Sequence, residues 1–238
     1  MKIEIVTHRW QYSKLLMYQL RSLLLFPPQR ATTLATVFFT EGDTATRDVV
    51  QYFSASEKPG NITIRGWNLD RERLLRRAIG RNLAALATDA DWIWVADCDY
   101  VFGENALDTL SEMPPRTSVD LVFPMVVLSS RSEQAGDELI QRARGDVRIM
   151  SIDPRSFAAV QFDRAIGGVQ IARGEVVRRH GYCRSEPRFQ KPAIRWMRTF
   201  DDVQFRKCLG TDGIPIDLPN VFRILHTRRG RIQLHASL

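Results

Sequence analysis

Two carboxylates, two residues apart, directly follow a short apolar run near the middle of the chain. Residues 92–96 are all apolar, and Asp97, Cys98 and Asp99 come immediately after them. In open parallel sheets, ligands bind at the carboxyl ends of the strands. Carboxylates held this close repel each other, and a divalent cation relieves the repulsion by taking their oxygens as ligands. An isolated Asp-x-Asp can also be a solvated turn after a strand. The elements that precede the motif indicate which of the two interpretations, metal site or turn, applies.

A second acidic pair, Asp201 and Asp202, opens a helix predicted over 201–209. Helix capping and favourable charge at a helix start account for one of the two acids but seldom require both. A carboxylate at such a position has the chemistry of a general base. The loop before it, predicted over 184–196, is rich in arginine, lysine and proline and shows no periodicity.

His226 ends an apolar strand predicted over 221–225, and Arg228 and Arg229 follow it closely. A neutral imidazole there has the chemistry of a metal ligand, and the alternative is a strand-end histidine bonded to backbone. Guanidinium groups suit phosphate oxygens, and the alternative for the two arginines is a basic tail in solvent.

The elements that position these residues alternate between strand and helix in the first hundred residues. Strands are predicted at 2–7, 34–39, 61–65 and 92–96, and helices at 12–26, 48–54 and 71–87. Strands separated by helices of this length predict βαβ units and a parallel sheet. Such a sheet brings the ends of its strands, and therefore Thr7, Glu41 and the first acidic pair, to one edge.

The second half is less regular. Strands are predicted at 121–128, 147–152, 169–172, 214–218 and 221–225, helices at 174–180 and 201–209, and a loop at 158–168. No stretch has the composition of a linker, so we expect a single α/β domain.

The composition excludes several classes of protein. The chain has 238 residues, 44% hydrophobic and 26% charged, which excludes a disordered tail and a collagen-like fibre. Cys98, Cys183 and Cys208 form no CxxC motif and indicate reduced thiols in a cytoplasmic protein. No apolar stretch is long enough to span a bilayer. The net charge of +7 lies wholly in the second half, which predicts a surface for an anionic partner.

The order of these motifs resembles that of GT-A fold glycosyltransferases, similar to family 2, over most of the chain. The matching segments are the opening strand, the turn at 41–43, Arg81-Asn82, Asp97-Cys98-Asp99, Gly167-Gly168, the run 200–206 and His226. The resemblance implies a GT-A fold, with a nucleotide-sugar half over 1–103 and an acceptor-binding, catalytic half over 104–238.

The resemblance also implies roles for residues. Asp99 would bind Mn²⁺ or Mg²⁺ with help from Asp97 and His226. Asp202 would be the general base of an inverting transfer, with Asp201 beside it in place of the Glu that the family usually has.

The donor would be a nucleotide-sugar, with a UDP-sugar as the first candidate. Thr7 and Glu41 would meet its nucleobase, Arg81 would face the nucleotide, and Arg228 and Arg229 would clasp the diphosphate. The other arginines of the predicted helix over 71–87 would form a solvated face. The acceptor would be a glycan or lipid-linked hydroxyl, with possible contact to the inner face of a membrane and none with nucleic acid.

Two other classes stay open on sequence alone. A haloacid-dehalogenase-like phosphatase also uses a strand-end Asp-x-Asp and a later acidic pair, but its first motif normally follows the first strand. A basic RNA- or lipid-binding module explains the net charge, but not the acids at predicted strand ends.

Overall fold

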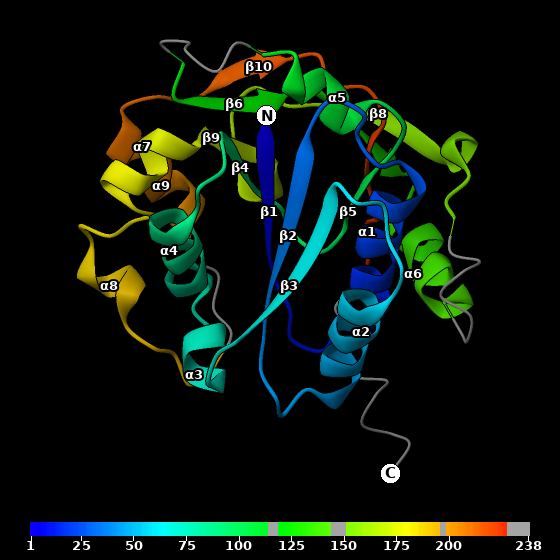
Figure 1. Ribbon diagram of the computed structural model, residues 1–238, viewed down its shortest axis with the longest axis horizontal. Coiled ribbons are helices and arrows are strands. Elements are labelled where there is room, and N and C mark those ends of the chain that lie inside the picture. Colours follow the sequence, from blue (N-terminus) through cyan, green and yellow to red (C-terminus); the bar gives the residue numbers. More distant parts are fainter. Residues whose placement is uncertain (114–118, 144–150, 196–198, 228–238) are drawn as a thin grey trace.

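A seven-stranded sheet forms the centre of the molecule (Figure 1). The computed structural model describes residues 1–113, 119–143, 151–195 and 199–227. In spatial order the strands of this sheet are β10 (Ile214–Ile216), β6 (Leu121–Pro124), β9 (Gln170–Arg173), β4 (Trp92–Val95), β1 (Lys2–His8), β2 (Thr32–Phe39) and β3 (Ile62–Asn68). Strands β3, β2, β1 and β4 are parallel, as the sequence predicts.

Strand β9 runs antiparallel to both of its neighbours, β4 and β6. It comes from the second half of the chain and lies inside the sheet, so the two halves share one hydrogen-bonded structure. The central strands are buried on both faces, with Trp92 and Trp94 fully covered. This explains why β4 is a continuous apolar run rather than an alternating one.

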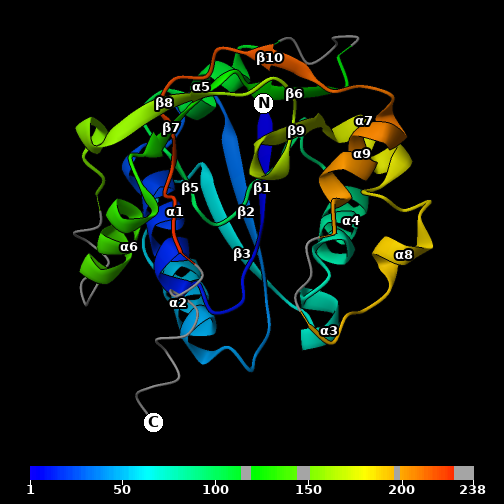
Figure 2. The same cartoon turned by 180° about the vertical axis from the view of Figure 1, so that it is seen from behind.

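Helices cover both faces of the sheet, and Figure 2 shows the two groups on opposite sides. One group contains α1 (Ser13–Leu25), α2 (Thr44–Ala55) and α6 (Glu133–Arg142). The other contains α3 (Arg71–Leu74), α4 (Arg77–Ala87), α7 (Gly174–His180), α8 (Pro187–Gln190) and α9 (Asp201–Leu209). A further helix, α5 (Ala106–Ser111), follows β5.

A second sheet of four strands was not predicted. Its order is β5 (Tyr100–Phe102), β11 (Val221–Arg223), β7 (Val126–Ser130) and β8 (Phe157–Gln161). The strand expected over 121–128 is two strands, because the chain leaves the large sheet at Met125 and enters the small one. The backbone of Met125 bonds to Ile216 on one side and Phe162 on the other. The loop expected over 158–168 begins as β8, and most of the strand expected over 147–152 lies outside the described residues.

The single helix expected over 71–87 is divided in two. Asp70 caps α3 by accepting from the Arg73 backbone N–H at 2.8 Å, and α4 begins afresh at Arg77. The break has a functional consequence, because α4 directs Arg77 and Arg81 toward the carboxylates at the end of β4.

Candidate active site

A pocket of about 170 Å³ lies where β1 and β4 end. Its lining residues come from four segments far apart in the sequence: His8, Trp10 and Tyr12; Arg77; Asp97, Cys98 and Asp99; and His226. The structure thus brings together the three residues that the sequence predicts as metal ligands.

The backbone at Asp97 is held by a buried polar chain. The Gln19 side chain on α1 donates to the Asp97 carbonyl at 3.0 Å, and Arg9 donates to Gln19 Oε1 at 2.6 Å. Arg9 is 1% exposed. Burial lowers the pKa of Arg9 to about 9, against the attraction of Asp99 and Asp97. A buried cation therefore stands behind the carboxylate pair.

Two arginines of α4 bind the Asp97 side chain. Arg77 and Arg81 each donate to Asp97 Oδ1 at 3.0 Å. Burial opposes ionisation of this carboxyl, but the two guanidinium groups keep its pKa below the ordinary value. Asp97 is therefore a carboxylate at neutral pH. The prediction that Arg77 belongs to a solvated helix face is wrong, since its side chain is only 21% exposed and lines the pocket.

Asp99 is paired from the opposite side. Arg223 on β11 donates through Nε to Asp99 Oδ2 at 2.9 Å. Burial would lower the pKa of Arg223, but Asp99 and Tyr100 raise it above the ordinary value. The Arg223–Asp99 pair also joins the small sheet to the end of β4.

The fit of this site to a divalent cation can be judged from the oxygens that remain. Asp97 Oδ2 and Asp99 Oδ1 accept no hydrogen bond from the described residues. His226 packs its ring against Tyr12, 4.9 Å between centroids, and its Nδ1 lies 3.2 Å from the Thr227 carbonyl. In the described part of the chain no three His, Cys, Asp or Glu side chains are close enough to hold an ion by themselves. The site suits Mg²⁺ or Mn²⁺ held by one or two carboxylates and completed by phosphate oxygens.

Asp201 is fully buried, which corrects the prediction that it is catalytic. Its Oδ2 accepts from Arg81 at 2.7 Å and its Oδ1 from Thr199 at 2.8 Å. Burial favours the neutral form, but Arg81, Arg77 and Thr199 lower the pKa of Asp201 to about 2. No substrate can reach a side chain that is 0% exposed. Asp201 instead positions Arg81 and the start of α9.

Arg81 is likewise not placed to face a nucleotide. It is 2% exposed, and its guanidinium bonds to Asp97, Asp201 and the Tyr182 hydroxyl. Asp97 belongs to the acidic motif after β4, and Asp201 to the acidic pair that begins α9. The buried Arg81 bonds to both and therefore links the two motifs. This is a correction of its predicted role as a nucleotide-binding residue.

Asp202 bonds to a turn, Gly167-Gly168, that packs against Asp97 of the first acidic motif. Its Oδ2 accepts from the Gly167 backbone N–H at 3.0 Å. Gly167 has a φ of 51°, and a Cβ on it would lie 3.7 Å from Asp97 Oδ2. A Cβ on Gly168 would lie only 2.6 Å from the Asp97 backbone nitrogen. Because neither glycine has a side chain, Asp97 can pack closely against this turn, and Asp202 bonds to the backbone of the same turn.

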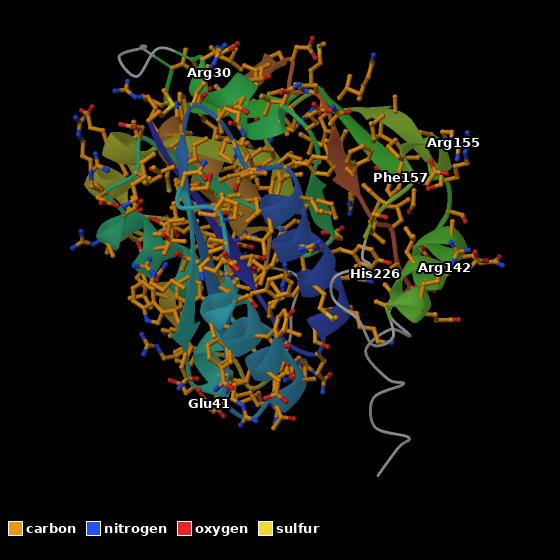
Figure 3. All side chains as sticks on the ribbon, turned by 45° about the vertical axis from the view of Figure 1, so that its right-hand side comes forward. Arg30, Glu41, Arg142, Arg155, Phe157 and His226 are labelled. Atoms are coloured by element: carbon orange, nitrogen blue, oxygen red, sulfur yellow. The ribbon has the colours of Figure 1, made fainter. Side chains whose placement is uncertain are left out.

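The residues predicted to meet a nucleobase lie at the ends of β1 and β2. Thr7 is buried, and its Oγ1 has no hydrogen-bond partner among the described residues. Glu41 is exposed in the turn after β2, where its backbone N–H donates to the Asn68 side chain at 3.2 Å (Figure 3). Asp43 in the same turn caps α2, with Thr46 donating to it. Arg228 and Arg229 lie outside the described residues.

The sequence analysis missed Arg9, Gln19, Arg77, Arg223 and Tyr182. Each acts through a partner between 10 and 124 positions away along the chain. A weak signal existed for Arg77 and Arg81, since they are four residues apart and share a helix face.

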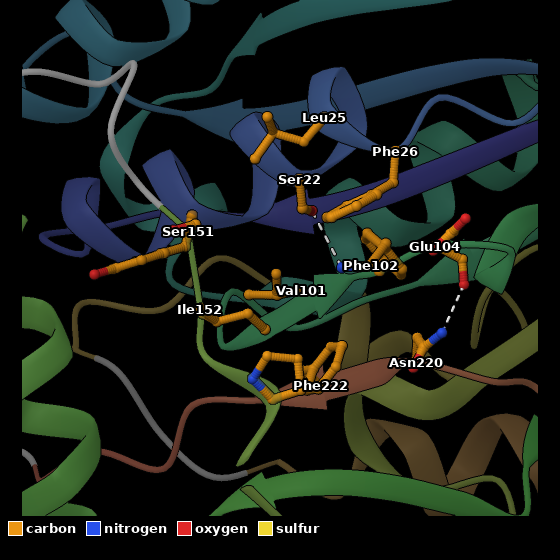
Figure 4. Close-up of a pocket in the computed structure, with 13 residues that line it drawn as sticks. Ser22, Leu25, Phe26, Val101, Phe102, Glu104, Ser151, Ile152, Asn220 and Phe222 are labelled. Atoms are coloured by element: carbon orange, nitrogen blue, oxygen red, sulfur yellow. Dashed lines mark hydrogen bonds between the residues drawn. The ribbon is translucent and has the colours of Figure 1, made fainter. Parts of the chain in front are cut away.

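Another pocket, of about 190 Å³ and mostly apolar, lies between α1 and the small sheet (Figure 4). Phe26, Phe102 and Phe222 contribute to its lining. The hydroxyl of Ser22 accepts from the Phe102 backbone N–H at 3.1 Å. Asp97, Asp99, Asp201 and Asp202 do not line this pocket, so it is not the candidate reaction site.

The described part of the chain has no helix that is both long and apolar enough to cross a membrane. No protein-family model matches the chain, and no curated protein matches its sequence.

Solved structures do match its fold. TarS residues 1–349 of S. aureus in complex with UDP is 14% identical, with a TM-score of 0.58, over 93% of this chain and 60% of that one. The same fragment with UDP-GlcNAc is 12% identical, with a TM-score of 0.56, over 93% of this chain and 58% of that one. Mannosyltransferase PcManGT of Pyrobaculum calidifontis, in complex with GDP-Man and Mn²⁺, is 12% identical, with a TM-score of 0.56. The match covers 95% of this chain and 57% of that one. The chain therefore spans about 60% or less of the length of these structures. The mostly parallel sheet and these neighbours together show that the chain has a GT-A-like fold.

Proposed function

We propose that the chain is a glycosyltransferase that moves a sugar from a nucleotide-diphosphate sugar to an acceptor hydroxyl. The observation that supports this most directly is that one glycine turn, Gly167-Gly168, contacts both the strand-end carboxylate Asp97 and the helix-start carboxylate Asp202. Asp97 and Asp99 line a pocket at the strand ends, and Asp202 lies across Gly167 from Asp97. Donor and acceptor chemistry would meet there.

The donor end requires neutralisation of a diphosphate. Asp99 and Asp97 would hold Mn²⁺ or Mg²⁺ together with phosphate oxygens of the donor, with His226 lining the same pocket. The ion when bound would supply Lewis-acid stabilisation of the departing phosphate. Arg77 adds a fixed cation to the lining of the same pocket. We propose a UDP-sugar as donor, with Thr7 and Glu41 near its nucleobase and Arg228 and Arg229 near its diphosphate.

Asp202 would be the general base. It would take the proton of the acceptor hydroxyl as that oxygen attacks the anomeric carbon, and the sugar would leave the nucleoside diphosphate in the same step. Direct attack of this kind inverts the anomeric configuration. The buried Arg81–Asp201 pair would hold the start of α9, and with it Asp202, at a fixed position relative to Asp97.

The first test is titration calorimetry with UDP, GDP and dTDP, with and without Mn²⁺, followed by assays of nucleotide release from UDP-GlcNAc and GDP-mannose. We expect Mn²⁺ to strengthen binding of one nucleotide, with UDP as the first candidate. Absence of metal-dependent binding for all three nucleotides would refute the proposal.

The residue test uses Asp99→Asn, which keeps the shape of the side chain and leaves a hydrogen-bond acceptor for Arg223. We expect Mn²⁺-dependent nucleotide binding to fall by more than tenfold. Thermal stability should also fall, because Arg223 loses its charged partner, so circular dichroism at the assay temperature is used to check that the variant is folded. The matched control is Asp48→Asn, at a carboxylate that is 63% exposed on α2 and outside the pocket. Equal nucleotide affinities in the two variants would exclude Asp99 from the site.

The alternative classes account for less of the structure. In a haloacid-dehalogenase-like phosphatase the Asp-x-Asp follows the first strand, whereas here it follows β4, after three βα units. A binding module does not require two carboxylates to be held in one pocket by arginines from α4 and β11.

A further inference from the structure

An open pocket of about 400 Å³ lies on the outer face of α9, the helix that begins with Asp201 and Asp202. Phe200, Gln204 and Lys207 project into it along one side of this helix. Arg188, on the short helix α8, and Arg76, between α3 and α4, form the facing wall.

The lining of this pocket is strongly basic. Arg76, Arg188 and Lys207 contribute three cations, and no acidic side chain lines the pocket in the described part of the chain. Arg76 uses its Nε on the Lys191 carbonyl rather than on a carboxylate. Arg188 has only a loose ion pair, with 3.9 Å between its Nε and Glu186 Oε2. The cations are thus not neutralised within the pocket.

An aromatic ring in a strained position borders the same pocket. Phe200 is 55% exposed, although phenylalanine is usually buried. Its φ of 52° and ψ of 32° put it in the left-handed region, which is unfavourable for a bulky residue. Exposure and backbone strain at one residue are typical of a functional position. An exposed ring next to cations suits a ligand with both an apolar face and a negative charge.

The pocket is connected to the carboxylate pocket through two side chains. Thr199 lines it and donates to Asp201 at 2.8 Å. Asp201 in turn lies 3.8 Å from Arg77 Nη2, and Arg77 lines the carboxylate pocket. A group bound among the cations would therefore be separated from the carboxylate pocket by the Thr199 and Asp201 side chains.

We propose that this pocket binds a negatively charged sugar unit of the acceptor, with a phosphate or carboxylate on Arg76, Arg188 and Lys207 and the sugar ring against Phe200. This inference rests on the proposed glycosyl transfer and specifies its acceptor class. Guanidinium and ammonium groups form charge-assisted hydrogen bonds with both kinds of anion. A concave site with one aromatic ring favours a sugar-sized anion over a flat lipid surface.

The test is titration calorimetry of the whole chain with glucose 6-phosphate, glucuronate and glucose. We expect the two anionic sugars to bind at least tenfold more tightly than glucose, and their relative affinities to show whether phosphate or carboxylate is preferred. Arg188→Gln combined with Lys207→Gln should weaken anion binding by at least tenfold. Phe200→Ala should weaken binding of all three sugars.

The control is Arg179→Gln, which removes one exposed cation from α7, away from the pocket. It should leave every affinity unchanged, and the double variant should keep wild-type affinity for UDP with Mn²⁺. Equal binding of charged and uncharged sugars, or unchanged anion binding in the double variant, would overturn the proposal. The proposal would also be overturned if the chain bound phosphatidylglycerol vesicles tightly, did not discriminate between the sugars, and lost vesicle binding in the double variant. Failure of nucleotide binding would instead refute the glycosyl transfer itself.

Discussion

Replacing Asp201 with asparagine tests the buried charge network most directly. Asp201 has a pKa of about 2, against an ordinary value of 3.8. Each pKa unit corresponds to about 1.4 kcal/mol, so ionisation of this fully buried side chain stabilises the fold by about 2.5 kcal/mol. Because the pKa is depressed on folding, this contribution is present above about pH 4 and is lost as the pH falls toward 2. Asp201→Asn keeps the shape and removes the charge.

The assay is urea unfolding followed by tryptophan fluorescence between pH 7 and pH 2.5. We expect Asp201→Asn to be about 2.5 kcal/mol less stable than the wild type at pH 7, and the difference to shrink steadily as the pH falls below 4. The control is Asp163→Asn, at a carboxylate that is 73% exposed. A loss below about 1 kcal/mol at pH 7, or a difference that does not change with pH, would show that Arg81 does not depend on Asp201 as described.

Two further substitutions test the base and the packing behind the pocket. Asp202→Asn should lower kcat by about 10² to 10⁴-fold while nucleotide affinity stays unchanged, because it removes only a proton acceptor; a kcat within tenfold of the wild type would exclude this role. Gly136→Ala should reduce the free energy of unfolding by about 2–3 kcal/mol, since the new Cβ would lie 1.6 Å from the Leu225 carbonyl oxygen. Gly42→Ala, where no atom lies within 4 Å, is its matched control in urea unfolding.

Sequence patterns were sufficient for the elements that are locally encoded. The apolar run 92–96 and the acids after it predicted both β4 and its position at a pocket, since a strand buried on both faces leaves few other arrangements. The helix over 201–209 was predicted with the bounds that α9 has.

The arginine partners could not be predicted, for a physical reason. Arg223 lies 124 residues from Asp99, and no local pattern shows which carboxylate an arginine will meet. Helix propensity likewise does not reveal the break before Arg77, where Arg76 leaves the helical conformation with a φ of −105° and a ψ of 86° and its side chain donates to the distant Lys191 carbonyl. The small sheet was missed because its strands pair across distant segments, and β8 has the exposed surface of a loop.

The position of β9 has a consequence for how such a chain can be divided. This strand, Gln170–Arg173, fills the gap between β4 and β6, so a cut after residue 103 would separate it from β4. The amino-terminal fragment would expose the whole edge of β4 at the place where the Asp-x-Asp begins, and an open edge of apolar strand recruits other chains. We therefore expect a fragment of residues 1–103 to aggregate when expressed alone, and the proposed donor half not to be exchangeable without the strand that the second half contributes.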